Sequence, residues 1–220
     1  SKTINVAVIA IIIVFQPELR RALEQLGQKN FFTSLFSFDS QKGQERFSER
    51  VTNEVVKATY EMAKVKTGAL IVIEQDVNLG EYERTGIALD SMISSQLLIN
   101  IFEHNTPLHD GAIIVRGERI VSATCYLPLS DNLSLSKELG TRHRAAVGIS
   151  EVCDALTIVV SEETGNVSIA IGGELYRNVD AEYLKGKLNF IRKGAMDVAR
   201  FRIWKRRMRH VQKNDEASGQ

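Results

Sequence analysis

The sequence predicts an α/β domain in which a central mixed β-sheet is flanked by helices. Short apolar runs such as Ala69–Ile73 and Ala155–Val160 are typical of buried strands. Helical patterns alternate with these runs, above all at Glu45–Lys66, where apolar residues recur every three or four positions. A chain of 220 residues, 44% of them hydrophobic, is long enough to fold around one core. Cys125 and Cys153 are too few and too far apart for a disulfide framework or a structural zinc site.

An apolar run of ten residues, Val6–Phe15, opens the chain, and the pattern predicts a helix at Gln16–Leu26 directly after it. The run is shorter than the roughly 20 apolar residues that span a bilayer. It is either a buried strand or helix, or the truncated end of a membrane helix. We therefore expect an apolar remnant of a membrane helix at 1–15 and a connecting helix and linker at 16–44.

The body of the chain, residues 45–176, is expected to alternate strands and helices. After Glu45–Lys66, the patterns predict a strand at Ala69–Ile73, a helix at Ser94–Phe102, strands at Ala112–Val115 and Arg119–Leu127, a helix at Arg142–Cys153, and strands at Ala155–Val160 and Val167–Ile171. Gly117 and Glu118 mark a hairpin turn between two of these strands. Thr141 is the expected N-cap of the helix that follows it.

The formal net charge of +1 hides an asymmetry along the chain. Residues 1–184 hold 17 Lys and Arg against 24 Asp and Glu, whereas residues 185–220 hold 11 against 3. The net negative charge of the larger part excludes a uniformly basic nucleic-acid binder.

The C-terminal tail, residues 177–220, has apolar residues at helical spacing between 188 and 211, and therefore predicts a basic amphipathic helix. Such a helix can lie on an anionic membrane surface. The alternatives are a solvated tail, a tail that covers the acidic face of the body, and a nucleic-acid-binding element.

Three stretches place polar groups at the ends of predicted strands and helices, where α/β proteins usually build their sites. The first is Pro107-Leu108-His109-Asp110-Gly111-Ala112, in which the carboxylate sits just before a strand. Its glycine allows a ligand to approach the backbone closely, and Asp110 could deprotonate a hydroxyl or bind Mg²⁺. An Asp-Gly pair before a strand also forms an ordinary turn, so this stretch does not decide the function alone.

The second stretch, Gly140-Thr141-Arg142-His143-Arg144, opens a helix. Two arginines in the first turn oppose the helix dipole unless an anion is bound there. Backbone N–H groups, a hydroxyl and guanidinium groups together make a phosphate site, whereas a solvated basic turn is the plain alternative.

The third stretch, Ser161-Glu162-Glu163-Thr164, closes a buried strand with two adjacent acids. These acids indicate a nearby cation, and His109 and Glu163 could share a divalent metal if the two strand ends adjoin. The alternative is an acidic hairpin loop.

Taken together, the three stretches resemble the diadenylate cyclase (DAC, or DisA-N domain) family, whose hallmark motifs are D-G-A and R-H-R. Here these are Asp110–Ala112 and Arg142–Arg144. Further segments resemble the family in order: GALIVIE at 68–74, NTPLHDGA at 105–112, CYLP at 125–128, KELGTRHRAAVGISEV at 137–152 and LTIVVSEET at 156–164. The front, Val14–Gly27, is similar to the membrane-anchored CdaA-type branch. Most of that branch's membrane helices are missing here, which implies a soluble truncation.

The resemblance implies that residues 45–176 are a diadenylate cyclase catalytic domain, which condenses two ATP molecules into cyclic di-AMP and releases pyrophosphate across a face-to-face homodimer. Asp110, with Gly111, would orient or deprotonate the attacking 3′-hydroxyl. Groups that bind the substrate would be Tyr126 and Leu127 beside adenine, and Gly140, Thr141, Arg142, His143, Arg144, Ser161 and Glu162 around the phosphates. His109 and Glu163 would ligate Mn²⁺ or Mg²⁺.

The resemblance also implies a cytoplasmic catalytic domain of a membrane-anchored bacterial protein, with no specific nucleic acid as partner. Membrane-proximal regulators would include a YbbR-domain protein and phosphoglucosamine mutase. The rival interpretation is a catalytically silent sensor that binds adenine nucleotides at the same phosphate site.

Overall fold

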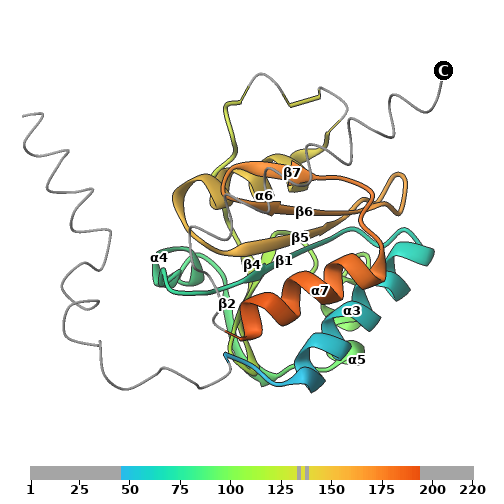
Figure 1. Ribbon diagram of the computed structural model, residues 1–220, viewed down its shortest axis with the longest axis vertical. Helices are drawn as coiled ribbons and strands as arrows, with labels where there is room; N and C mark the ends of the chain where they lie inside the picture. Colours follow the sequence, from blue (N-terminus) through green and yellow to red (C-terminus); the bar gives the residue numbers. More distant parts are fainter. Residues whose placement is uncertain (1–45, 133–134, 137–138, 194–220) are drawn as a thin grey trace, which may run out of the picture. The chain divides into compact units, whose positions relative to one another are not determined.

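The described part of the chain forms one seven-stranded mixed sheet with helices on both faces, which confirms the predicted α/β class (Figure 1). The computed structural model describes residues 46–132, 135–136 and 139–193. In chain order the elements are α3 (Glu49–Lys64), β1 (Ala69–Ile73), α4 (Gly80–Glu83), β2 (Ile87–Met92), α5 (Ser95–Phe102), β3 (Ala112–Arg116), β4 (Arg119–Cys125), α6 (Thr141–Val152), β5 (Leu156–Val160), β6 (Val167–Ile171), β7 (Glu174–Tyr176) and α7 (Ala181–Arg192). The predicted elements at 6–15 and 16–26 lie outside the described residues.

The strand order is β2-β4-β3-β1-β5-β6-β7. Only β1 and β3 run parallel, and every other neighbouring pair is antiparallel. Consequently the starts of β1, β3 and β6 lie at the same edge of the sheet as the ends of β4, β5 and β7. We call this side of the sheet, which is formed by the ends of the strands and not by an outermost strand, the site edge.

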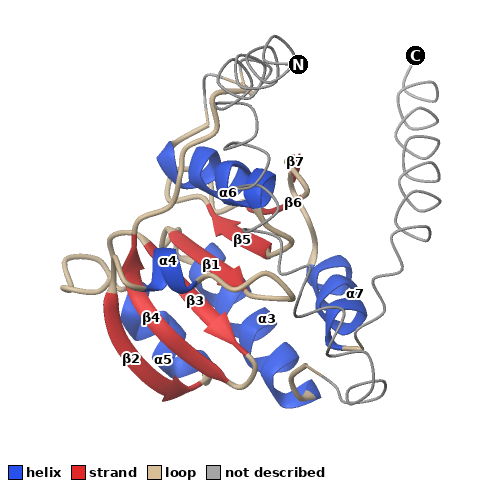
Figure 2. Cartoon of the chain, turned by 90° about the vertical axis from the view of Figure 1, so that its left-hand side faces the viewer, coloured by secondary structure: helices blue, strands red, loops and turns tan. Residues whose placement is uncertain are grey.

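The two faces of the sheet carry separate apolar layers. On β1, Ala69, Ile71 and Ile73 face the layer formed with α3, α5 and α7, while Leu70 and Val72 face α6. Figure 2 shows α6 on one side of the sheet and α3, α5 and α7 on the other. This alternation follows from the two-residue period of a strand. It explains why a strand covered by helices on both faces is apolar throughout.

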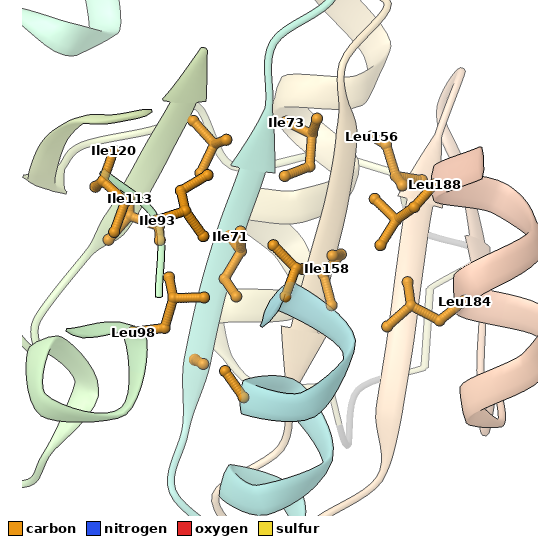
Figure 3. Packing of buried hydrophobic residues seen from close by; sticks show 14 of the residues in the cluster. Ile71, Ile73, Ile93, Leu98, Ile113, Ile120, Leu156, Ile158, Leu184 and Leu188 are labelled. Carbon is orange, nitrogen blue, oxygen red and sulfur yellow. The ribbon is translucent and has the colours of Figure 1, made fainter. Parts of the chain in front are cut away.

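The helix α7 extends the body beyond residue 176, where we expected a tail to begin. Asp180 Oδ1 caps α7 by accepting from the Tyr183 N–H at 2.7 Å. Leu184, Leu188 and Ile191 are buried in the layer that also holds Ile71 and Ile158 (Figure 3). The helix therefore begins before residue 188, and its first turns belong to the core. The basic segment after residue 193 lies outside the described residues.

The helix α6 begins without a side-chain cap, in contrast to α3 and α5. The side chains of Ser48 and Ser94 accept N–H groups at the starts of α3 and α5. At α6, in contrast, Gly140 is the N-cap and no side chain caps the helix. The prediction that Thr141 is the N-cap was therefore wrong, because Thr141 is already the first helical residue. The first N–H groups of α6 remain available to a ligand.

Candidate active site

The residues that the sequence analysis singled out lie along the site edge, because adjacent strands bring them there. Tyr126 and Leu127 follow the end of β4, and His109, Asp110 and Gly111 precede β3. The group at Ser161–Glu163 follows the end of β5, while Gly140 and the first turn of α6 approach from one face. A register that pairs Ala112 with Cys125, and Ala69 with Val160, fixes this arrangement.

Gly111 positions the exposed carboxylate of Asp110 through a close contact between two strands. Its φ of 104° lies in a region that only glycine adopts readily. A Cβ atom at this position would lie 2.9 Å from the Thr124 carbonyl carbon. Any other residue would therefore push β3 and β4 apart where Asp110 is anchored.

The imidazole of His109 is fixed in one tautomer. Its Nδ1 lies 2.5 Å from the carbonyl oxygen of Thr106, and because a carbonyl only accepts, Nδ1 must carry the proton. The ring also makes an edge contact with His104, with 5.6 Å between centroids. The Nε2 lone pair is then the one available to a metal, an arrangement common among histidine ligands.

Arg142 forms an ion pair with Glu162 at the start of α6. Its Nη1 lies 2.5 Å from Glu162 Oε2, and the two side chains are 21% and 62% exposed. Gly68, just before β1, lies beneath this pair: a Cβ atom there would be 2.8 Å from Arg142 Nη1 and 2.9 Å from Glu162 Oε2. The guanidinium and the carboxylate occupy space that any side chain at 68 would fill.

His143 and Arg144 lie in the first turn of α6. His143 is only 8% exposed, and desolvation, together with the positive charge of Arg177, lowers its pKa. We therefore expect a neutral imidazole at neutral pH. The Nε atoms of Arg142 and Arg144 are buried, and neither has a hydrogen-bond partner among the described residues. Such N–H groups suit an anionic ligand.

The segment after β4 is fastened to α6 by close backbone packing. A Cβ atom at Gly148, inside α6, would lie 2.1 Å from the Pro128 carbonyl oxygen. The Ser130 N–H donates to the Arg144 carbonyl at 3.0 Å, and the Ser130 hydroxyl donates to Glu151 at 2.6 Å. The position of Tyr126 and Leu127 is thus linked to the helix whose start carries Arg142.

Tyr126 and Leu127 differ in exposure. Tyr126 is 70% exposed, while its backbone N–H donates to the Thr85 hydroxyl at 2.9 Å. Leu127 packs against the apolar layer beneath α6. An exposed ring beside an apolar side chain can bind a flat aromatic ligand by stacking.

A cavity of about 270 Å³ opens between the start of α6 and the end of the β5–β6 hairpin. It brings together Gly140–His143 and Ser161–Glu163, which the sequence analysis selected. Thr164, also from the third stretch, lines it too, and the lining continues onto residues outside the three stretches: Leu139, Val160, Asn166, Ser168, Arg177 and Asn178. His109, Asp110, Gly111, Tyr126 and Leu127 lie along the same edge but do not line this cavity.

His109 and Glu163 do not adjoin within one subunit. β1 lies between β3 and β5, so the two strand ends are two strand spacings apart, about 10 Å. Within the described residues, no group of three or more His, Cys, Asp and Glu side chains could hold a metal ion. A metal bound among these described residues would therefore need further oxygens from a ligand such as a phosphate.

Sequence reasoning missed Gly68, Gly148 and Arg177. The two glycines matter because of the atoms that face them, which no local pattern reveals. Gly148 did interrupt a helical pattern, and such a glycine often marks a close packing contact. Arg177 follows a strand of only three residues and had no signal of its own.

Comparisons with known proteins identify relatives of this chain. The model of the DAC family, described as DisA bacterial checkpoint controller nucleotide-binding, matches residues 56–175. Over 180 residues the chain is 56% identical to the cyclic di-AMP synthase CdaA of Bacillus subtilis, a match that covers 82% of this chain and 64% of that protein. Over 176 residues it is 58% identical to a diadenylate cyclase of Listeria monocytogenes, covering 80% and 63%.

The fold also matches a crystal structure of a double mutant of DacA from Staphylococcus aureus. The TM-score is 0.64 at 52% identity, and the match covers 65% of this chain and 95% of that one. The chain spans slightly under two thirds of the two curated relatives' lengths. In the part of the chain that the structure describes, no helix is long and apolar enough to cross a membrane.

Proposed function

This chain belongs to the DAC family, within its CdaA-type branch, and from that membership we propose that it is the catalytic part of a diadenylate cyclase. Two ATP molecules would give one cyclic di-AMP and two pyrophosphates. Each 3′-oxygen forms a bond to the α-phosphorus of the other ATP. The bond from that phosphorus to its bridging oxygen breaks, and pyrophosphate leaves with the electron pair.

The observation that carries this proposal is that Asp110 lies along the same edge of the sheet as a cavity lined by phosphate-binding groups. Asp110 is exposed and precedes Gly111, so its carboxylate can accept the proton of a 3′-hydroxyl. The helix start with Thr141 and Arg142, and Ser161, line the cavity further along this edge. N–H groups, a guanidinium and hydroxyls are the donors that phosphate oxygens need.

The order of strands supports a direction for the nucleotide along the site edge. Tyr126 and Leu127 follow β4, Asp110 precedes β3, and Ser161 follows β5. With adenine against Tyr126 and Leu127, the ribose would lie near Asp110 and the phosphates would lie toward the cavity. His143 and Arg144 would hold the helix start, and Glu162 would align Arg142.

The family in general needs a divalent metal, which withdraws negative charge from phosphate oxygens. His109 would bind Mn²⁺ or Mg²⁺ through Nε2, since its Nδ1 is engaged by Thr106. Glu163, which lines the cavity, is the second proposed ligand. Because β1 separates the two residues, phosphate oxygens would complete the coordination of either one.

A homodimer is part of the proposed mechanism, because one site holds only one ATP and the reaction joins two. Two copies that face each other along the site edge would bring each 3′-hydroxyl to the other α-phosphorus. Holding both reactants in this geometry replaces a collision of two ligands by a reaction within one complex. The membrane anchor and the membrane-proximal regulators remain proposals that rest on the CdaA-type branch.

Asp110→Asn tests the proposal. The variant keeps the size of the side chain but cannot accept a proton, so we expect cyclic di-AMP formation to stop while ATP still binds. Asp90→Asn is the matched control: it removes an exposed carboxylate on β2 at a φ of 46°, which asparagine tolerates, and should leave turnover unchanged. Turnover retained in Asp110→Asn would refute the assigned role. Binding without turnover in the unchanged chain would favour the silent sensor.

A further inference from the structure

The cavity beside α6 extends beyond the residues proposed to bind the nucleotide. Its outer wall is built by Asn166 just before β6, Ser168 on β6, and Arg177 and Asn178 directly after β7. None of these lies in the three stretches that carry the family resemblance. They form one continuous lining with Arg142 and Ser161, so a ligand held by these two also meets the outer wall.

The β6–β7 ladder aims two of these residues at the cavity. Ile169 pairs with Tyr176, so the next positions along the antiparallel ladder are Ser168 and Arg177. Ile169 faces the opposite apolar layer, and because side chains alternate along a strand, Ser168 faces the α6 side. Ser168 is 2% exposed, which makes it a fixed polar group in the cavity wall.

The guanidinium of Arg177 has no bonding partner among the described residues. It forms no ion pair and no hydrogen bond there, in contrast to Arg142, which is held by Glu162. It lies close enough to His143 for its charge to lower the pKa of that imidazole. The carboxylates that line the same cavity are Glu162 and Glu163. A guanidinium in the cavity lining that has no partner among the described residues suits an anion.

We propose that Arg177 and Ser168 form a subsite for the β- and γ-phosphates of ATP, and so for the departing pyrophosphate. The inference rests on the proposed function for the identity of the nucleotide. Along the site edge the strand order runs β4, β3, β1, β5, β6, β7, from Tyr126 to Arg177. A nucleotide with adenine at Tyr126 points its last phosphates toward Arg177.

The subsite would act on the leaving group. When the bond between the α-phosphorus and its bridging oxygen breaks, negative charge grows on the pyrophosphate, and a guanidinium beside it stabilises that charge. Arg142 at the start of α6 would hold the phosphate under attack, and Arg177 would hold the part that leaves. Two cations on separate elements would thus serve the two products of the bond cleavage.

Arg177→Gln tests the subsite with 3′-deoxyATP and 3′-deoxyAMP, which lack the attacking hydroxyl and so bind without reaction. Isothermal titration with Mn²⁺ present should give an affinity for 3′-deoxyATP lowered about tenfold to a hundredfold, the range for loss of a hydrogen bond to a charged group. Affinity for 3′-deoxyAMP should change less than about twofold, because it has no β- or γ-phosphate. Arg177→Lys keeps the charge and should lose less.

Arg119→Gln is the matched control, since it removes one exposed arginine charge at the opposite edge of the sheet. Equal loss for both nucleotides in Arg177→Gln, or no loss, would overturn the subsite. If pyrophosphate inhibited turnover equally in Arg177→Gln and in the wild-type chain, the subsite would also be overturned. Thermal unfolding of each variant shows whether the fold is intact. If either of these outcomes were found and the wild-type chain still made cyclic di-AMP, the subsite would be refuted while the proposed function stood.

Discussion

Arg142 and Glu162 meet directly above Gly68, with 2.5 Å between Nη1 and Oε2. The pair joins the first turn of α6 to the end of β5, across the start of β1. It holds a guanidinium at a helix start that has no side-chain cap. Phosphate oxygens of the proposed nucleotide would compete with Glu162 for this guanidinium, so the pair would set Arg142 in place before such a ligand binds.

The ion pair should contribute little to folding and much to binding. Glu162 is 62% exposed, and exposed ion pairs contribute about 0–1 kcal/mol. A double-mutant cycle of Arg142→Ala and Glu162→Ala, followed by urea denaturation, should give a coupling below about 1 kcal/mol. ATP affinity should fall at least about tenfold in Arg142→Ala, because a charged hydrogen bond is lost. A larger coupling with unchanged ATP affinity would mean that the pair is structural.

Gly68→Ala should disturb catalysis without unfolding the protein. The added Cβ would displace Arg142 Nη1 and Glu162 Oε2, both at the ends of side chains that can move. We expect the KM for ATP to rise and the unfolding free energy to change by less than about 1 kcal/mol. Gly186→Ala on α7, where nothing lies within 4 Å of the added Cβ, is the control and should leave KM unchanged. An unchanged KM in Gly68→Ala would show that the pair has room to shift.

Gly148→Ala should destabilise the fold, because its Cβ would lie 2.1 Å from the backbone oxygen of Pro128. A backbone atom cannot move aside as a side chain does, so α6 and the segment after β4 must separate. Overpacking of this kind costs about 1–3 kcal/mol, more than the roughly 1 kcal/mol that alanine gains over glycine in a helix. Denaturation midpoints measure the balance, with Gly186→Ala as the helical control. A stabilised Gly148→Ala variant would contradict the close contact.

Lys187 should make the protein more stable as the pH rises above 8. Burial lowers its pKa to about 8, while the rings of Tyr176 and Tyr183, at 6.0 and 5.3 Å from Nζ, favour the ammonium and oppose part of this shift. Above pH 8 the folded state releases this proton first, so the unfolded state binds more protons and stability rises with pH.

The rise in stability above pH 8 should disappear in Lys187→Met. The measurement is the difference in unfolding free energy between the unchanged chain and Lys187→Met from pH 7 to 9.5. It must be a difference because burial raises the pKa of Cys153 to about 11, which works in the opposite direction over this range. Lys185→Met on the same helix is the control. A constant difference across the range would show that Lys187 keeps its ordinary pKa.

The sequence predicted the strands best where the apolar pattern was unbroken. The bounds of Ala69–Ile73 and Val167–Ile171 agree with the structure, because buried strands need apolar residues on both faces. The edge strand β2 escaped prediction, since most of its side chains are exposed and its ladder is irregular around Asp90. Tertiary pairing, not local pattern, makes it a strand.

Chemistry carried by a local motif was also predictable, whereas chemistry assembled by the sheet was not. Asp110 and Arg142 stood out as polar groups at element ends. Arg177 reaches the same cavity only because β7 lies at the end of the strand order. His109 and Glu163 are a second case, because β1 separates the ends of β3 and β5 beside which they lie. Strand order decides both cases, and a single sequence does not reveal it.

The most direct test of the central claim is chromatography of the products formed from ATP and Mn²⁺, with pyrophosphate measured in the same reaction. We predict cyclic di-AMP as the product, with two pyrophosphates for each molecule formed, and neither product in Asp110→Asn. Linear pppApA or ADP as the only product would contradict it.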